Sequence, residues 1–509
     1  MKKINPPLLL IALLVVACKN PQPKESEDSS QPAPAYDANW ESLSKHNEEP
    51  EWFQDGKLGI YFHWGVYSVP AFGNEWYPRW MHYEDTKEYQ HHLATYGHPS
   101  EFGYHDFVPM FTAEHFDAEA WADLFERAGA KFAGPVAEHH DGFSMWASDI
   151  TPWNAKDKGP KKDITGELGE ALKKRDLRLI TTFHHARNLQ RHDSVADEGG
   201  RTYWASHYPF LEGMPPSSND PDLKYLYGNI PREEWLEKVW LGKVKEVVDK
   251  YQPDIIWFDS WLDRIPEKYR QEMAAYYLNR ADEWGKEVVI VRKQDDLPLD
   301  LSVDDLEKSR KNRLEEKVWM TDETISKGSW CYTKDLKIKE TKDVLHVLVD
   351  IVSKNGVLLL NISPMKDGTI PENQKEVLLG MGQWLGQYGE AIYGTRPWYT
   401  FGEGPTKEPE GHFKNNKEFL KIKYSSKDTR YTTKDNNIYA TMLGRPEKDQ
   451  ILLKSFAKDS LPSPVAIADV SILGSTEKVT WELQDGGLAL TSPAANMNEM
   501  APVYKIVLQ

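Results

Sequence analysis

The chain has 509 residues, of which 40% are hydrophobic and 28% charged, and its formal net charge is −17 at pH 7. That length is enough for a large buried core and for two or more domains. The negative charge argues against nucleic acid and against an anionic membrane surface as partners, because both repel an acidic protein.

The first eighteen residues have the pattern of an export signal. Two Lys residues precede an apolar run at 8–16, which is too short to span a bilayer. The letters VVAC, ending at Cys18, resemble a bacterial lipobox. We therefore predict cleavage before Cys18 and lipid attachment to it, with an ordinary signal peptide and an incidental Cys as the alternative. The only other Cys is Cys331, so a lipidated Cys18 leaves no intrachain disulfide.

A polar segment rich in Pro and Ser follows at 19–38, and it is predicted to be a flexible tether. No later segment is apolar enough to cross a membrane. The sequence therefore predicts an exported protein that touches the membrane only through a lipid anchor. The anchor is expected on the periplasmic or the cell-surface face of a bacterial envelope.

Residues 39–398 alternate short apolar runs with amphipathic helical patterns, which is typical of β/α units. Strands are predicted at 58–62, 132–137, 177–183, 255–258, 288–291 and 357–362. Helices are predicted at 116–128, 163–175, 233–250, 266–284, 341–353 and 373–388. This alternation predicts a catalytic barrel of parallel strands surrounded by helices.

Polar residues follow four of these strands at the same relative place. They are His63, the pair His139 and His140, His184 with its neighbour His185, and Asp259. The carboxyl ends of parallel strands converge on one face of a barrel, so these side chains are expected to meet. Asp259 ends the run Ile255-Ile256-Trp257-Phe258 and is the first candidate for a catalytic nucleophile. The alternative is that Asp259 only caps the helix that follows.

Residues 399–509 show alternating patterns and turns without helical periodicity. Strands are predicted at 419–424, 437–442, 450–456, 465–473, 478–483 and 503–508. Such spacing favours an antiparallel β-sandwich. This domain is expected to pack against the barrel; a carbohydrate-binding module is the alternative.

Several kinds of chemistry lack their motifs in this sequence. There is no HExxH, no GxSxG, no Walker loop and no GxGxxG after a strand. The adjacent His pairs do not have a helical metal-ligand spacing, so no metal and no other cofactor is predicted. Carboxylates, imidazoles and indoles at a barrel mouth remain, and they suit glycoside hydrolysis. The 19 Trp and 24 Tyr agree with this, because aromatic faces stack on sugar rings.

The chain resembles the family 29 glycoside hydrolases, which are retaining α-L-fucosidases, over nearly all of residues 40–400. The blocks that carry the resemblance are LGIYFHWGVYSVPAFGNEWYPRWM (58–81), FAGPVAEHHDGFSMW (132–146), GPKKDITGELGEALKKRDLRL (159–179), PDIIWFDS (253–260), GSWCY (328–332) and the long run at 352–398. The resemblance implies an α/β fold with a (β/α)8-like, TIM-type barrel, followed by the C-terminal β-sandwich. It implies no cofactor.

The resemblance also implies roles for single residues. Asp259 corresponds to the nucleophile of the family. The residues that correspond to the pocket are His63, Trp64, Glu75, His139, His140, His184, Trp257 and Arg292, with Lys293 as the alternative to Arg292. Glu75 could instead be a surface carboxylate, and Trp64 could be a packing residue of the barrel.

The acid/base block departs from the family pattern. A Glu is expected after Trp319, but Met320 stands there, and a thioether cannot donate a proton. Glu323 is the first substitute, Glu138 beside the His pair is the second, and Asp322 is the third. A retaining mechanism needs the second carboxyl about 5 to 5.5 Å from the nucleophile.

The resulting prediction is a retaining exo-α-L-fucosidase that acts on terminal α-L-fucose of an oligosaccharide or polysaccharide. One alternative is an α-L-galactosidase or a hydrolase of modified, for example sulfated, fucosides. Another is a fucose-binding lipoprotein without catalysis, suggested by Met320. Linkage preference is expected to depend on loops outside the pocket, such as 188–229 and 294–317, and the sequence indicates no oligomeric state.

Overall fold

The computed structural model describes residues 1, 34–189, 207–208, 218–259, 262–409 and 417–509. Apart from residue 1, the predicted signal peptide lies outside the described residues, and so does most of the predicted tether. Near the end of the tether, Tyr36 is fixed to a helix: its N–H donates to Asn279 Oδ1 at 2.9 Å, and its carbonyl accepts from Asn279 Nδ2 at 2.8 Å. Within the described residues, no helix has both the length and the apolar composition that crossing a membrane requires.

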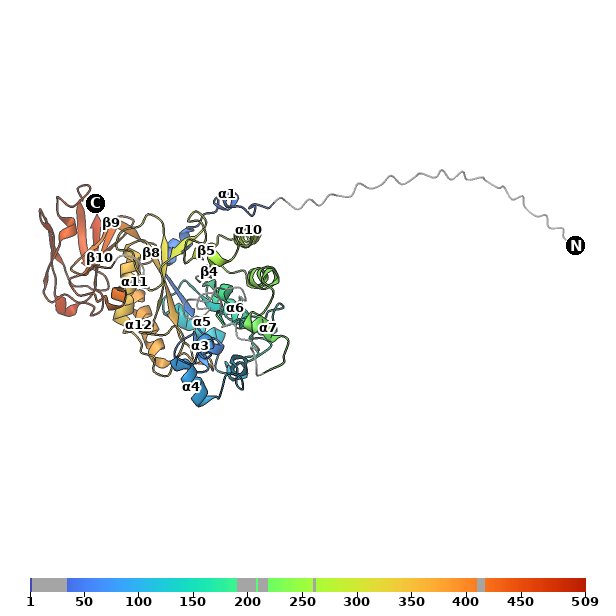
Figure 1. The fold of residues 1–509 in the computed structure, drawn as a ribbon. Coiled ribbons are helices and arrows are strands. Elements are labelled where there is room, and N and C mark those ends of the chain that lie inside the picture. Colours follow the sequence, from blue (N-terminus) through green and yellow to red (C-terminus); the bar gives the residue numbers. More distant parts are fainter. Residues whose placement is uncertain (2–33, 190–206, 209–217, 260–261, 410–416) are drawn as a thin grey trace. The chain divides into compact units, whose positions relative to one another are not determined.

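Eight parallel strands close into a barrel in chain order, with the last strand paired to the first (Figure 1). The strands are β1 Leu58–Phe62, β2 Phe132–Glu138, β3 Arg178–Phe183, β4 Ile255–Phe258, β5 Val289–Arg292, β6 Val303–Asp305, β7 Trp319–Thr324 and β8 Gly356–Ile362. The predicted (β/α)8-like fold is confirmed. Strands β6 and β7 were not predicted, because β6 has three residues and both strands carry acidic side chains.

The two faces of the barrel strands bury different clusters. Tyr61, Val136, Trp257, Met320 and Leu359 come from strands around the whole barrel yet share one buried cluster, which therefore fills the interior. The alternate residues of these strands pack in the layer between strands and helices. Since cross-strand partners point to the same face, the register of each pair tells which way a side chain points.

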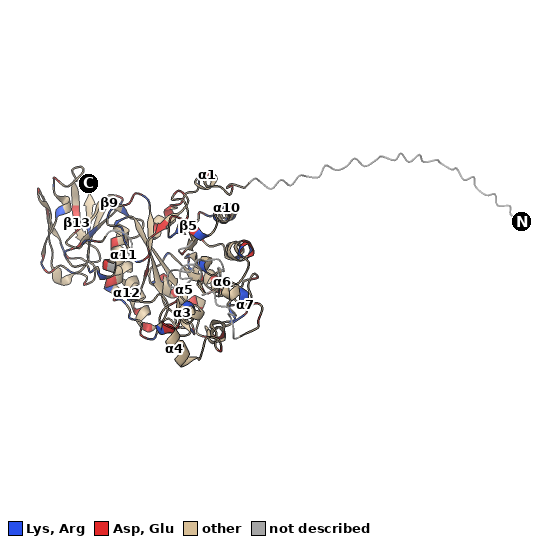
Figure 2. Cartoon of the chain, in the orientation of Figure 1, with Lys and Arg blue, Asp and Glu red and all other residues tan. Residues whose placement is uncertain are grey.

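Helices form the outer layer of the barrel (Figure 1). The longer ones are α4 Lys87–Thr95, α5 Ala118–Arg127, α6 Ile164–Lys173, α9 Gly242–Tyr251, α10 Glu267–Trp284, α11 Thr341–Ser353 and α12 Glu372–Tyr388. The shorter ones are α1 Trp40–Leu43, α2 Glu51–Gly56, α3 Tyr77–Trp80, α7 Leu223–Tyr227 and α8 Arg232–Glu234. A wider π-type segment at Trp235–Leu241 joins α8 to α9, where one helix was predicted. Figure 2 shows acidic and basic residues interspersed over this layer.

Two antiparallel sheets form the C-terminal part, as predicted. One has the order β13-β16-β11-β10-β9, and the other has the order β12-β15-β14. Their strands are β9 Arg396–Glu403, β10 Thr429–Lys434, β11 Asn437–Met442, β12 Gln450–Leu453, β13 Ile467–Ile472, β14 Thr480–Gln484, β15 Gly487–Thr491 and β16 Val503–Leu508. The predicted strand at 419–424 is wrong, because 417–421 forms a 3-10 turn. β9 begins at Arg396 and so crosses the predicted boundary at 398.

A buried ionic network joins the barrel to the C-terminal sheets. Asp350, on α11, accepts from Lys354 Nζ at 2.8 Å and from Arg430 Nε, on β10, at 2.7 Å. Arg430 also contacts Glu408 at 2.9 Å. These four side chains are at most 3% exposed. The charges are therefore mutually dependent, because removing one leaves an excess charge buried in a network of two cations and two anions.

Candidate active site

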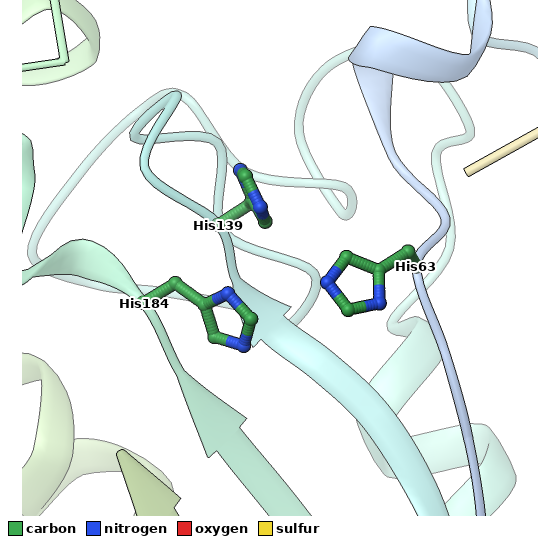
Figure 3. A group of neighbouring side chains, drawn as sticks. All are labelled: His63, His139 and His184. Atoms are coloured by element: carbon green, nitrogen blue, oxygen red, sulfur yellow. The ribbon is translucent and has the colours of Figure 1, made fainter. Parts of the chain in front are cut away.

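The predicted strand-end residues meet at the carboxyl end of the barrel. The rings of His63, His139 and His184 come from the ends of β1, β2 and β3, and their centroids lie 5.0 to 5.5 Å apart. Figure 3 shows the three rings directed toward one another. All three side chains are buried. The sequence-based expectation that these side chains converge is correct in its geometry.

Asp259, after β4, lies beside this group. Its carboxylate is 3.3 Å from His140 Nε2, 4.0 Å from His184 Nδ1 and 3.0 Å from Lys293 Nζ. Burial alone raises the pKa of Asp259, but the Lys293 ammonium and the hydrogen bond from His140 outweigh burial and hold the pKa well below its usual range. Asp259 is therefore ionised at neutral pH, as a nucleophile must be.

His63, His139 and His184 are neutral at pH 7, because burial lowers their pKa values; the pKa of His63 falls to about 3. Asn361 fixes the tautomer of His63. The Asn361 amide nitrogen donates to Thr324 and to the carbonyl of Trp330, so its oxygen, 2.8 Å from His63 Nδ1, must accept from that ring. His63 thus presents Nε2 as an acceptor.

Two ring nitrogens, His139 Nδ1 and His184 Nε2, are buried and have no hydrogen-bond partner among the described residues. Buried polar atoms are normally paired, so an unpaired set at a barrel mouth fits a polar ligand. Together with His63 Nε2 they form a compact array of donors and acceptors. A sugar with adjacent hydroxyl groups suits such an array.

Aromatic side chains line the same region. Trp257 is fully buried in the barrel interior, with its ring centroid 5.1 Å from that of His184 and 4.8 Å from Lys293 Nζ. Trp330 stacks on His63 at 5.3 Å, and Trp76 lies half-buried at 5.1 Å from His140. Trp76 and Trp330 were not predicted as site residues, although both stand in blocks that carry the family resemblance.

Glu75 is buried rather than at the surface. Its Oε2 accepts from the Trp330 N–H at 3.3 Å and from Ser329 Oγ at 3.4 Å. Burial raises the pKa of Glu75. The structure thus links Glu75 to His63 through Trp330, at the edge of the histidine group.

Two predicted pocket residues lie elsewhere. Trp64 is fully buried among Phe62, Phe116 and Trp121 and donates to the carbonyl of Met365, so it packs between strands and helices. Arg292 donates to the carbonyl of Leu297, outside the barrel interior. The next residue, Lys293, points inward instead, as the alternation of side chains along a strand requires.

Both leading candidates for the acid/base lie on the wrong face of their strands. Glu323 pairs in register with Leu360, which belongs to the layer under the helices, and its carboxylate binds Lys339 at 2.9 Å. Burial raises the pKa of Glu323, but Lys339, Lys308 and Arg310 outweigh it and the pKa is lowered. A carboxylate on the outer face of the strand does not face the barrel mouth, so Glu323 is not placed to act as a general acid there.

Glu138 is excluded by the same argument. It pairs in register with Phe183, an outward-facing residue, and both oxygens lie 2.8 Å from Lys243 Nζ of α9. Both side chains are fully buried. Glu138 therefore fixes the segment before His139 and His140 and does not face the site.

Breaking this ion pair is expected to destabilise the protein. Lys243→Met should lower the free energy of unfolding by about 3 to 5 kcal/mol, because the Glu138 carboxylate stays buried without its counterion. Urea unfolding followed by Trp fluorescence measures this loss. The double variant Glu138→Leu with Lys243→Met should recover most of it, and a double variant as unstable as the single one would contradict the pairing.

Met320, which stands where a Glu was expected, lies in the barrel interior and is fully buried. Its register partners are Asp305 and Val357. Two residues further along the same face is Asp322, which lies 3.5 Å from Lys293 Nζ. The Met at this position therefore removes no proton donor from the mouth.

The structure presents another carboxylate that sequence reasoning missed. Glu307 follows the short strand β6, its side chain is 11% exposed, and its Oε2 lies 3.3 Å from Lys293 Nζ. Asp259 contacts the same nitrogen at 3.0 Å. The shared contact with Lys293 brings the Asp259 and Glu307 carboxylates to the same side of the barrel mouth. The rule that strand ends carry the polar residues would have found Glu307, had β6 been recognised.

Among the residues that the structure describes, two groups of side chains have the geometry to hold a metal ion. They are His63, His139 and His184, and His140, His184 and Asp259, each with donor atoms within 4.8 Å of one another. The Lys293 ammonium at 3.0 Å from Asp259 opposes a divalent cation there by charge repulsion. The donor set fits a hydroxylated ligand better than a metal.

Comparison with known proteins agrees with this site. A family model described as alpha-L-fucosidase matches residues 24–390, and a model described as alpha-L-fucosidase C-terminal domain matches residues 423–509. Tissue alpha-L-fucosidase of Rattus norvegicus is 32% identical over 484 residues, covering 90% of this chain and 88% of the relative. The Homo sapiens tissue enzyme is 31% identical over 509 residues, covering 96% and 93%.

A solved structure shows the same architecture. The crystal structure of Thermotoga maritima alpha-fucosidase in complex with fucose has a TM-score of 0.72 and 29% identity, and the match covers 93% of this chain and 100% of that one. Both family models, the curated relatives and the closed barrel lead to one conclusion. The chain belongs to the α-L-fucosidase family of glycoside hydrolases.

Proposed function

We propose that this protein is a retaining exo-α-L-fucosidase that removes terminal α-L-fucose from a glycan, with Asp259 as nucleophile and Glu307 as acid/base. The observation that carries the proposal is the contact of both carboxylates with one ammonium, Lys293, at the mouth of the barrel. The family relationship supports the substrate, because the Thermotoga maritima relative is described in complex with fucose.

In the first step, an Asp259 oxygen attacks the anomeric carbon while the glycosidic C–O bond breaks. Glu307 gives its proton to the departing oxygen, so the products are a fucosyl ester of Asp259 and the free aglycone. In the second step, Glu307 takes a proton from water, the hydroxyl oxygen bonds to the anomeric carbon, and the ester C–O bond breaks. Two displacements at one carbon retain its configuration.

Lys293 connects the two steps. In the free enzyme its charge is shared between Asp259, at 3.0 Å, and Glu307, at 3.3 Å. Formation of the ester removes the negative charge of Asp259, so the ammonium then faces Glu307 as its nearer counterion. That change favours the ionised form of Glu307, which the second step needs as a base.

Fucose recognition is assigned to the histidine group and its aromatic walls. The ring nitrogens of His63, His139 and His184, with Glu75 at the edge, offer polar partners to three hydroxyl groups. Trp330 and Trp257 offer apolar surface to the methyl group on carbon 5. L-galactose carries an additional hydroxyl there, which an apolar wall leaves without a partner.

The proposal is tested with aryl glycosides. The protein lacking residues 1–18 should hydrolyse p-nitrophenyl α-L-fucoside and should prefer it to the α-L-galactoside by at least about tenfold, because burying an unpaired hydroxyl costs more than 1 kcal/mol. NMR spectra recorded in the first minutes should show α-L-fucose as the initial product. An initial β-anomer would refute the double displacement, and equal rates on the two glycosides would refute the assigned wall.

We also propose that Cys18 carries a lipid and that the enzyme acts in a bacterial cell envelope, on its periplasmic or cell-surface face, on fucosylated oligosaccharides or polysaccharides. The lipobox-like sequence and the short apolar run before Cys18 support this. Cells expressing the full chain and fed an alkyne fatty acid should label the protein, and Cys18→Ser should abolish the label. Label that persists in the variant, or a soluble wild-type protein, would contradict the anchor.

A further inference from the structure

A second pair of carboxyl groups lies beside the catalytic pair, inside the barrel. Asp305, at the end of β6, and Asp322, on β7, are each 1% exposed. We propose that these two groups share one proton and act as a unit that holds Lys293 between Asp259 and Glu307. The inference rests on the proposed function for the roles of Asp259 and Glu307.

The hydrogen-bond pattern supports a shared proton between the two groups. Asp322 Oδ2 accepts from Tyr61 OH at 3.0 Å, but Asp322 Oδ1 and both oxygens of Asp305 have no donor among the described residues. Carboxylates accept hydrogen bonds only, so two that face each other in a barrel interior repel unless one is protonated. A single proton satisfies both: Asp305 donates it and Asp322 accepts it.

The surroundings decide which partner keeps the proton. The charged and titratable groups that face the pair are Tyr61 of β1, Lys293 after β5 and Glu307 after β6. Burial and the Asp322 charge raise the pKa of Asp305 well above its usual range. Burial raises the pKa of Asp322 as well, but Lys293, 3.5 Å away, opposes that rise. Asp305 is therefore the protonated member and Asp322 the anionic one.

An anionic Asp322 gives Lys293 a third carboxylate contact. The ammonium then lies 3.0 Å from Asp259, 3.3 Å from Glu307 and 3.5 Å from Asp322. Without the Asp322 charge, the ammonium interacts more strongly with the two catalytic carboxylates and favours their ionised forms. The pair therefore acts as a positioning and tuning element, through the contact of Asp322 with Lys293.

The pH dependence of kcat/KM on p-nitrophenyl α-L-fucoside tests this role in three variants. Asp322→Asn removes the charge, so the limb on the alkaline side should move down by about one pH unit. Asp305→Asn keeps a donor toward Asp322 and should retain the wild-type pH profile. Asp305→Leu has no donor and should shift the profile. Identical profiles for Asp305→Asn and Asp322→Asn, or an unshifted Asp322→Asn, would overturn the inference.

Stability against pH gives a readout that does not depend on catalysis. A carboxyl group that keeps its proton in the folded protein stabilises the fold at low pH. This contribution is lost as the pH rises from the group's pKa in the unfolded chain, about 4, through its raised pKa in the folded protein. The stability of Asp305→Asn relative to the wild type should therefore increase with pH across that range. A constant difference, with normal hydrolysis, would refute the proton-sharing pair alone. The expected increase in a protein without fucosidase activity would instead refute the proposed function.

Discussion

Replacing Asp259 by Ala is expected to abolish the release of p-nitrophenol from p-nitrophenyl α-L-fucoside. The loss in kcat should be at least about 10³-fold, or roughly 4 kcal/mol in activation free energy. The reason is that the ester intermediate cannot form without this carboxylate, which the Lys293 ammonium at 3.0 Å keeps ionised. p-Nitrophenolate departs with little help from an acid, so the assay reports the nucleophile and the sugar pocket independently of the acid/base.

Asp263 provides a matched control for Asp259. It lies four positions later in the chain, and its side chain is 53% exposed beside Arg264. Asp263→Ala should therefore keep wild-type kinetics. Added azide should partly restore turnover of Asp259→Ala, because a small anion can enter the space of the carboxylate and give a fucosyl azide. Equal losses in both variants, or an Asp259→Ala enzyme that remains active, would remove Asp259 from the mechanism.

The second large effect is expected for Glu307→Ala, and it should depend on the leaving group. A general acid contributes typically 10²- to 10⁴-fold. We expect a loss in that range on fucosyl disaccharides, whose alkoxide leaving groups need a proton. On p-nitrophenyl fucoside the first step should change little, while the slower second step should let the fucosyl-enzyme accumulate. Rapid-mixing measurements should then show a burst of p-nitrophenol, followed by slow turnover that azide accelerates.

Glu323→Ala is the control for this prediction, because Glu323 was the first substitute suggested by the sequence. Its carboxylate lies on the outer face of β7 with Lys339. Its removal should lower stability and leave the dependence on the leaving group unchanged. A leaving-group effect in Glu323→Ala and none in Glu307→Ala would reverse the assignment made from the structure.

The parts of the site that could be predicted are those that follow apolar strands. β1 to β4 are buried runs, so their ends were visible, and the residues after them, His63, His139, His184 and Asp259, do meet. The other site residues were harder to predict, because neighbouring side chains along a strand point to opposite faces. A shift of one position separates Arg292, which faces outward, from Lys293, which faces Asp259, and only the pairing register distinguishes the two.

Glu307 was missed because its strand has no apolar signature. β6 has three residues, and Asp305 points into the barrel, where a hydrophobic residue is the usual choice. β7 likewise carries Asp322 on its inner face. These buried acids are stabilised by Lys293 and by each other rather than by hydrophobic contacts. The local sequence therefore looks like a loop, and a pattern-based search for strand ends stops before Glu307 is reached.

The ionic network between α11 and β10 has a consequence for how sequences of this family can vary. Asp350 lies in the barrel and Arg430 in the C-terminal sheets, yet the two share one fully buried contact at 2.7 Å. A substitution at either position leaves an excess charge in a buried cluster of two cations and two anions, and both domains contribute to that cluster. The two domains are therefore expected to be inherited together, with covarying residues at 350, 354, 408 and 430, and exchange of the C-terminal domain between relatives requires that these four positions match.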